Sequence, residues 1–225
     1  THMSGDALDG CVLVVGLGNR QVTPDALGPA VCDLVFVTRH MHEYAPEEID
    51  KRIGVVSAIA PGVLGITGIE TGEIVSGVVE SLKPSLVIAI DSLASRALER
   101  VRTTVQVANT GIAPGAGIGN KRKALDRESL GVPVLAIGVP LVVYASTIAQ
   151  ELMDTALKQA PIDLRINDKL QKVLAGLNDV DGADMIVTPK EIDKVVQDLA
   201  RIIADALNIA LHRNLTLEET RRYMH

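Results

Sequence analysis

The centre of this sequence is an apolar run that ends on a carboxylate, Leu86-Val87-Ile88-Ala89-Ile90-Asp91. Its apolar part shows no alternation of polar and apolar side chains, which predicts a strand buried on both faces, as in a parallel sheet covered by helices. We interpret residues 92–95 as a turn. Asp91 then lies at the carboxyl end of its strand, the edge where open α/β sheets bind ligands. Alternatively, Asp91 only caps a following helix, expected around residues 94–99.

The composition agrees with a helix-covered sheet. Hydrophobic residues make up 47% of the 225 residues and aromatic residues only 2%, so the core consists mainly of Val, Ile, Leu and Ala. Lys and Arg total 22 against 28 Asp and Glu, a net charge of −6. This balance, with so few aromatic rings, argues against a nucleic-acid-binding protein. No apolar stretch has the length of a membrane span and no signal peptide is visible, so we expect a cytoplasmic protein without membrane contact.

Cysteine and histidine give little sign of a metal site. Cys11 and Cys32 lie in apolar segments without a partner at metal-ligand spacing, which favours buried free thiols over a disulfide. His40 and His42 could chelate a metal from a strand, but they fall in a polar connection and are interpreted as solvated. We expect neither a metal nor a cofactor.

A second polar residue is expected at the same edge of the sheet. Residues 11–17 predict the first strand, which runs into Gly18-Asn19 but lacks the third glycine of a dinucleotide-binding motif, because position 21 is Gln. Asp25 follows in the next loop. Its alternative role is that of a first-turn acid favoured by a helix dipole.

Two helix starts are predicted from capping patterns. Thr67 and Glu70 form a capping-box pattern before a helix that extends to Leu82, after a strand at 53–60 and a glycine-rich loop at 61–68. Glu70 remains a candidate site residue because it is close to the sheet edge. The run Thr188-Pro189-Lys190-Glu191 predicts the start of a long amphipathic helix that continues to about Ala210.

The middle of the chain predicts two further strands, at 103–107 and 132–139. Pro140 is expected to end the second one, and a helix starting near Val142 then carries Tyr144 in its first turn. Between these strands lies a glycine-rich loop followed by basic residues, interpreted as lining the substrate; its candidate binding residues are Thr110, Asn120 and Lys121.

Together these elements predict an α/β fold with three layers, a mostly parallel sheet flanked by helices, of the phosphorylase/hydrolase-like type. We expect residues 1–10 to be a tag or linker and residues 11–225 to form a single peptidase-like domain. Residues 159–184 are more polar and only partly periodic, and are interpreted as a mobile insertion within it.

Several motifs, in this order, resemble the germination protease family of spore-forming bacteria: Val14–Asn19 with Val22–Pro29, Ala60–Glu73, Val87–Asp91, Gly117–Arg122 and Ile137–Pro140. The resemblance implies an aspartic-type endopeptidase that degrades small acid-soluble spore proteins in the spore core during germination. It also implies a self-processing zymogen that forms a homotetramer. The family's core is similar to that of hydrogenase maturation proteases.

The resemblance also implies roles for three residues. Asp91 matches the family's first proposed catalytic aspartate, and Asp25 matches an acidic position that binds metal as Glu in the hydrogenase maturation relatives. The second proposed aspartate falls where this chain has Tyr144, whose phenol has an ordinary pKa of about 10 and is a poor base at neutral pH. Because an acid pair needs two carboxylates in different protonation states, this departure predicts weak or absent proteolysis.

Three functions therefore stay open. The first is a peptidase in which Asp91 and Asp25 polarise a water molecule. The second is a non-catalytic family member that binds protein or peptide, and the third is a metal-dependent maturation protease, for which Ala113 and Tyr144 occupy the places of a histidine ligand. In each case we expect Asp25, Asp91 and Tyr144 to converge on one pocket with Glu70 at its border. The mean hydropathy of +0.26 and the long apolar helix also predict a homo-oligomer.

Overall fold

The computed structural model describes residues 9–113, 124–159, 172, 176 and 182–224. Within these residues the strands form one six-stranded sheet. Their bounds are β1 Val12–Gly16, β2 Val56–Ile59, β3 Leu86–Ser95, β4 Gln106–Ala108, β5 Val134–Tyr144 and β6 Ile186–Val187. The helices are α1 Leu27–Cys32, α2 Arg39–Tyr44, α3 Leu64–Thr67, α4 Thr71–Leu82, α5 Arg127–Leu130, α6 Ala145–Gln159, α9 Ile192–Leu211 and α10 Leu217–Tyr223, with single 3-10 turns at η2 Thr23–Asp25 and η3 Leu98–Arg100.

The sheet is mostly parallel, as predicted. Its strand order is β2-β1-β3-β5-β4, and the first four of these strands run in the same direction. β4 and β6 both pair antiparallel with β5. The connections between the parallel strands therefore cross the faces of the sheet, which is where α1 and α4 lie.

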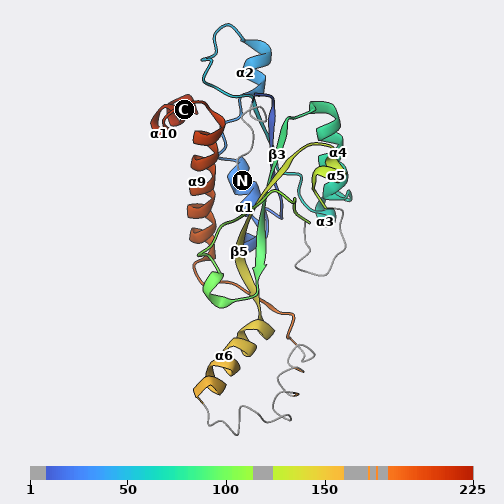
Figure 1. Cartoon of the computed structure of the whole chain (residues 1–225), viewed down its shortest axis with the longest axis vertical. Helices are drawn as coiled ribbons and strands as arrows, with labels where there is room; N and C mark the ends of the chain where they lie inside the picture. Colours follow the sequence, from blue (N-terminus) through green and yellow to red (C-terminus); the bar gives the residue numbers. More distant parts are fainter. Residues whose placement is uncertain (1–8, 114–123, 160–171, 173–175, 177–181, 225) are drawn as a thin grey trace.

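Helices cover both faces of the sheet and bury alternate residues of each strand (Figure 1). Val14 and Ile88 pack against α1 and α9 on one face. Val15 and Ala89 pack against α4 and α5 on the other face. The apolar run at 86–90 is buried on both sides, as expected from its lack of alternation, and the three-layer α/β fold predicted from the sequence is confirmed.

The central strand is longer than predicted. β3 continues through Asp91 to Ser95 because β5 continues beside it, with Ser92 opposite Val139 and Ser95 opposite Val143. The expected turn at 92–95 and the expected helix at 94–99 are therefore wrong, and only η3 is helical in that region. Pairing with a neighbouring strand outweighs the local turn preference of the serines.

The expectation that Pro140 ends its strand is also wrong. β5 runs through Pro140 to Tyr144, so Tyr144 is the last residue of a strand and not part of a first helical turn. A proline removes one ladder hydrogen bond, and the register of β3 with β5 shifts at this point, between Leu93 and Ala94. The Pro140 carbonyl accepts a hydrogen bond from the main-chain N–H of Arg102 at 2.7 Å, so the irregular stretch keeps a partner.

Both predicted caps differ from the structure. The N-cap of α4 is Glu70, which makes no side-chain capping bond, whereas Thr67 ends α3 inside the expected loop and donates to the Ile69 carbonyl. The long helix α9 begins at Ile192, later than its sequence pattern predicts. The Thr188 hydroxyl donates instead to the Leu141 carbonyl at 3.1 Å and so ties this segment to β5.

Other sequence predictions have mixed outcomes. The strand expected at 103–107 lies at Gln106–Ala108. His40 is exposed, but His42 lies in α2, partly buried, with Nε2 3.1 Å from the Ile53 carbonyl, so it is not simply solvated. Cys11 and Cys32 are both free thiols, as predicted, but each is only partly buried. Most of the expected insertion at 159–184 lies outside the described residues.

Candidate active site

A cavity with a volume of about 720 Å³ lies beyond the carboxyl end of β1. This is within the range of small-molecule and cofactor pockets in proteins. Its lining comes from the η2 region, the second half of β3, η3, β4, β5 and β6: Val22, Pro24, Asp25, Asp91, Ser92, Leu93, Ala94, Ser95, Arg96, Arg100, Gln106, Ala113, Val142, Tyr144 and Ile186. The cavity therefore brings together Asp25, Asp91 and Tyr144.

Asp25 is held at the cavity by the turn that follows β1. Its Oδ2 accepts the main-chain N–H of Asn19 at 2.7 Å. Gly18 adopts a φ of 109°, and a β-carbon there would lie 2.0 Å from the Asp25 carbonyl oxygen. Only glycine fits both this backbone conformation and this contact, so Gly18 fixes where the Asp25 carboxylate lies.

The start of α1 packs closely against the ends of β1 and β3. A β-carbon on Gly28 would lie 2.4 Å from the Leu17 carbonyl oxygen and 2.6 Å from that of Ile90. The residue after Ile90 is Asp91, so this close approach brings the η2 turn to the point on β3 where the second carboxylate lies. Gly18 and Gly28 thus join the two halves of the site. From the sequence alone, Gly18 belongs only to an incomplete dinucleotide-binding motif and Gly28 has no assigned role.

Asp91 is buried, with 6% of its surface exposed. Its Oδ1 accepts the main-chain N–H of Ser92 at 2.9 Å, which orients the carboxylate along the strand. A buried carboxylate needs such donors, because burial without them costs several kcal/mol. The residue lies in the middle of β3, directly opposite Gly138 of β5.

Tyr144 lies at the far end of the same cavity. Asp91 is level with Gly138, and Tyr144 is six residues further along β5, which corresponds to about 20 Å of extended strand. A carboxylate side chain at position 144 would be too short to span this distance. An acid there would not share a proton with Asp91, whereas Asp25 lines the same cavity from the η2 turn that follows the neighbouring strand β1.

The other predicted site residues are dispersed. Glu70 flanks α4 and does not line the cavity, and Thr110 is exposed and does not line it either. Asn120 and Lys121 lie outside the described residues. The expectation that Glu70 borders the pocket is therefore wrong.

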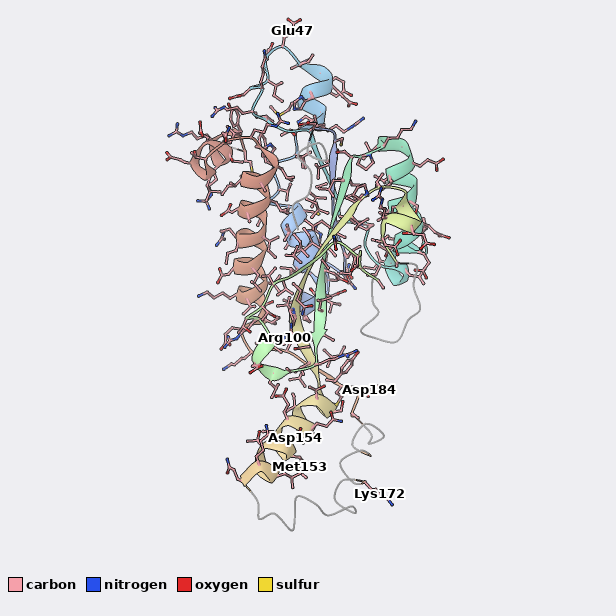
Figure 2. The ribbon with its side chains drawn as sticks, viewed as in Figure 1. Glu47, Arg100, Met153, Asp154, Lys172 and Asp184 are labelled. Carbon is pink, nitrogen blue, oxygen red and sulfur yellow. The ribbon has the colours of Figure 1, made fainter. Side chains whose placement is uncertain are left out.

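Sequence reasoning missed five polar residues of the lining: Ser92, Ser95, Arg96, Arg100 and Gln106. Arg100 lies at the end of the sheet from which α6 leaves, and the Leu98 main-chain N–H donates to Glu151 of α6 at 3.0 Å (Figure 2). The helix expected at 94–99 gave no reason to place Arg96 at this edge of the sheet. Recognising that β3 continues past Asp91 would have directed attention to them.

Neither thiol nor metal chemistry is indicated among the residues that the structure describes. Burial raises the pKa of the Cys32 thiol to about 11, and its Sγ lies 3.5 Å from the Ile59 carbonyl, so this cysteine is a packing residue and not a nucleophile. In the same part of the chain no group of three or more His, Cys, Asp or Glu side chains could hold a metal ion. No described helix is long and apolar enough to cross a membrane.

Comparison with known proteins agrees with the motifs. The family model for germination protease matches residues 3–180 and 165–224. The chain belongs to the germination protease family. It is 50% identical over 224 residues to the germination protease of Clostridium perfringens strain 13, covering 94% of this chain and 69% of the relative.

More distant members of the germination protease family match over similar lengths. The germination protease of Caldanaerobacter subterraneus is 49% identical over 229 residues, covering 96% of this chain and 71% of the relative. The germination protease of Halalkalibacterium halodurans is 42% identical over 264 residues, covering 98% of this chain and 71% of the relative. Among solved structures, a NiFe hydrogenase maturation protease from Thermococcus kodakarensis covers 87% of this chain, with 91% of its own length, at a TM-score of 0.42 and 16% identity.

Proposed function

We propose that this chain is an aspartic-type endopeptidase in which Asp25 and Asp91 form the acid pair. One observation carries the proposal: the Asp91 carboxylate of β3 and the Asp25 carboxylate of the η2 turn after β1 line a single cavity, and each accepts a main-chain N–H. Membership of the germination protease family supports the protease activity.

The chemistry of such a pair follows from its unequal protonation. Two nearby carboxylates do not ionise together, so one holds a proton while the other is charged. The charged carboxylate takes a proton from a water molecule, which attacks the carbonyl carbon of the scissile peptide bond. The protonated carboxyl donates to the carbonyl oxygen, and a proton then passes to the leaving amine as the C–N bond breaks.

The substrates we propose are small acid-soluble spore proteins, cleaved in the spore core during germination. The names of the relatives support a role in germination. We also propose that the chain is synthesised as a self-processing zymogen and that residues 11–225 form a single domain.

We further propose that the chain assembles as a homo-oligomer, a tetramer by resemblance to its family. The outer face of α9 supports assembly, because Ile202 and Ile209 are 62% and 48% exposed there. Light scattering over a range of concentrations checks this proposal. A single monomeric mass at every concentration contradicts it.

The catalytic proposal is tested by incubating the chain with a purified small acid-soluble spore protein and measuring initial cleavage rates. Asp25→Asn and Asp91→Asn should each lower kcat by at least about 10³-fold, since a pair acts as a unit. Asp33→Asn is the matched control, because Asp33 is an exposed carboxylate paired with Arg20 outside the cavity. Normal cleavage by either site variant contradicts the acid pair.

Two further outcomes separate the remaining functions. A strong metal chelator should leave the rate unchanged, and loss of activity that added metal restores would favour a metal-dependent protease. Absence of cleavage by the unaltered chain, with retained binding of the spore protein, would indicate a non-catalytic binding protein.

A further inference from the structure

The cavity lies along the edge of β3 and not on one face of the sheet. Consecutive residues from Asp91 to Arg96 all line it. In a strand, alternate side chains point to opposite faces. A cavity above one face would therefore be lined by every second residue, whereas a cavity beside the strand edge meets each residue in turn.

This edge is open because β1 is shorter than β3. The β1 ladder ends where Gly16 pairs with Ile90, and Leu17 donates the next bond to the Ile90 carbonyl at 2.8 Å. β3 then continues to Ser95 with β5 on its other side. Among the residues that the structure describes, no strand pairs with the edge of residues 92–95 that faces away from β5.

The open edge defines a slot that continues the line of β1. Neighbouring strands lie about 4.8 Å apart, so the slot is the position that one further strand would take beside β3. Residues of the η2 region, Val22, Pro24 and Asp25, also line the cavity, and Asp91 stands where the slot begins. Asp91 therefore lies at the end of the slot that adjoins β1, and Asp25 lines the same cavity.

We propose that this slot binds the main chain of the substrate as an added strand. An extended, unfolded polypeptide segment pairs with the edge of Ser92–Ser95 and so presents its scissile bond to Asp25 and Asp91. Addition of a strand to an exposed sheet edge is a general mode of peptide recognition, in which main-chain hydrogen bonds supply the affinity. This inference rests on the proposed endopeptidase function and adds the substrate class, an extended main chain, and its register.

A second exposed edge competes as a docking site but lies too far away. β4 ends the sheet, all three of its residues are exposed, and Gln106 is level with Gly138 and hence with Asp91. However, β5 lies between β4 and β3, so a peptide on the outer edge of β4 would be about 14 Å from β3, three strand spacings. A bond held there would not reach the carboxylates.

The first experiment measures binding of synthetic peptides to the unaltered chain. Overlapping 12-residue peptides that cover a small acid-soluble spore protein are screened by fluorescence anisotropy. If the strongest binder is cleaved, it is remade with the cleaved amide reduced to an amine. A series of variants of this peptide then carries a single N-methyl group, at each main-chain position in turn. We expect Kd to rise by at least about tenfold at alternate positions, where an edge hydrogen bond is lost, and by less than about threefold between them.

A flat N-methyl profile, or the absence of any binding peptide at millimolar concentration, overturns the proposal. These measurements report binding and do not depend on catalysis. Failure of the acid pair is seen separately, as normal cleavage by Asp25→Asn or Asp91→Asn.

The second experiment locates the paired edge by amide hydrogen exchange with the reduced peptide bound. Exchange should slow by at least about tenfold at those amides of residues 92–95 that face away from β5, with no change at β4 (106–108). Protection at 106–108 without protection at 92–95 would place the peptide on the outer edge of the sheet and contradict the proposal. Lack of protection at both edges would contradict it as well.

Discussion

Gly18 and Asp25 are in direct contact: a β-carbon on residue 18 would lie 2.0 Å from the Asp25 carbonyl oxygen and 3.1 Å from its Oδ1. The positive φ of Gly18 permits this approach. The position of one proposed catalytic carboxylate thus depends on a residue without a side chain.

We therefore expect Gly18→Ala to displace the Asp25 carboxylate and to lower kcat/KM by about 10²-fold, because small misplacements of catalytic groups have effects of that size. Initial rates on a spore-protein substrate provide the measurement. Gly131→Ala is the matched control, since Gly131 also has a positive φ but no atom within 4 Å of its β-carbon position. Equal losses in both variants would show that backbone strain, and not the contact with Asp25, causes the effect.

Tyr144 provides a test of which residues make up the acid pair. The resemblance implies a second aspartate at this position, whereas the register of β5 places it about 20 Å along the strand from the level of Asp91. We expect Tyr144→Asp to change the cleavage rate by less than about threefold, because the new acid would not share a proton with Asp91. A large gain in rate would restore the interpretation that Tyr144 replaces a catalytic acid.

His212 should make stability depend on pH. It is fully buried at the end of α9, its Nδ1 accepts the Gly54 N–H at 3.1 Å, and its ring contacts Phe36 at 5.1 Å. Burial lowers the pKa of His212 to about 4 from an ordinary 6.5. The unfolded chain takes up a proton more readily than the folded one, so this stabilisation is complete above about pH 6.5 and is lost as the pH falls toward 4.

The loss should amount to about 2 kcal/mol in the free energy of unfolding, measured by guanidinium titration between pH 7 and 4.5. His212→Asn should flatten the pH dependence in this interval relative to the unaltered chain. His40→Asn, a change at an exposed histidine, should leave the dependence as it is. Parallel curves for the unaltered chain and His212→Asn would contradict the prediction.

Asn208 joins α9 to the segment after α1. It is fully buried, its Oδ1 accepts the Phe36 N–H at 2.8 Å, and its Nδ2 donates to the Leu34 carbonyl at 3.1 Å. Asn208→Leu should lower the free energy of unfolding by about 2–4 kcal/mol, because it leaves two main-chain groups unpaired. Gln197→Ala, at an exposed polar position of the same helix, should change it by less than about 0.5 kcal/mol. Denaturant unfolding compares the two, and equal effects would contradict the role of Asn208.

The apolar run at 86–90 was sufficient to predict a parallel sheet buried on both faces, and the periodicity of 192–210 was sufficient to predict α9. Both signals are local: burial on two faces removes alternation from a strand, and burial on one side imposes a 3.6-residue repeat on a helix. The carboxylates Asp25 and Asp91 could be assigned to one edge of the sheet for the same reason, because each follows an apolar run of recognisable pattern.

Tertiary structure alone decided where β3 and β5 end. The serines after Asp91 and the proline at 140 favour turns, but the two strands pair with each other across both sites and absorb the proline at a shift of register. Pairing between residues 47 or 48 positions apart cannot be predicted from either segment alone. Because that pairing carries β3 past the end of β1, it determines the open edge, turns Arg96 and Arg100 toward the cavity, and separates Tyr144 from Asp91.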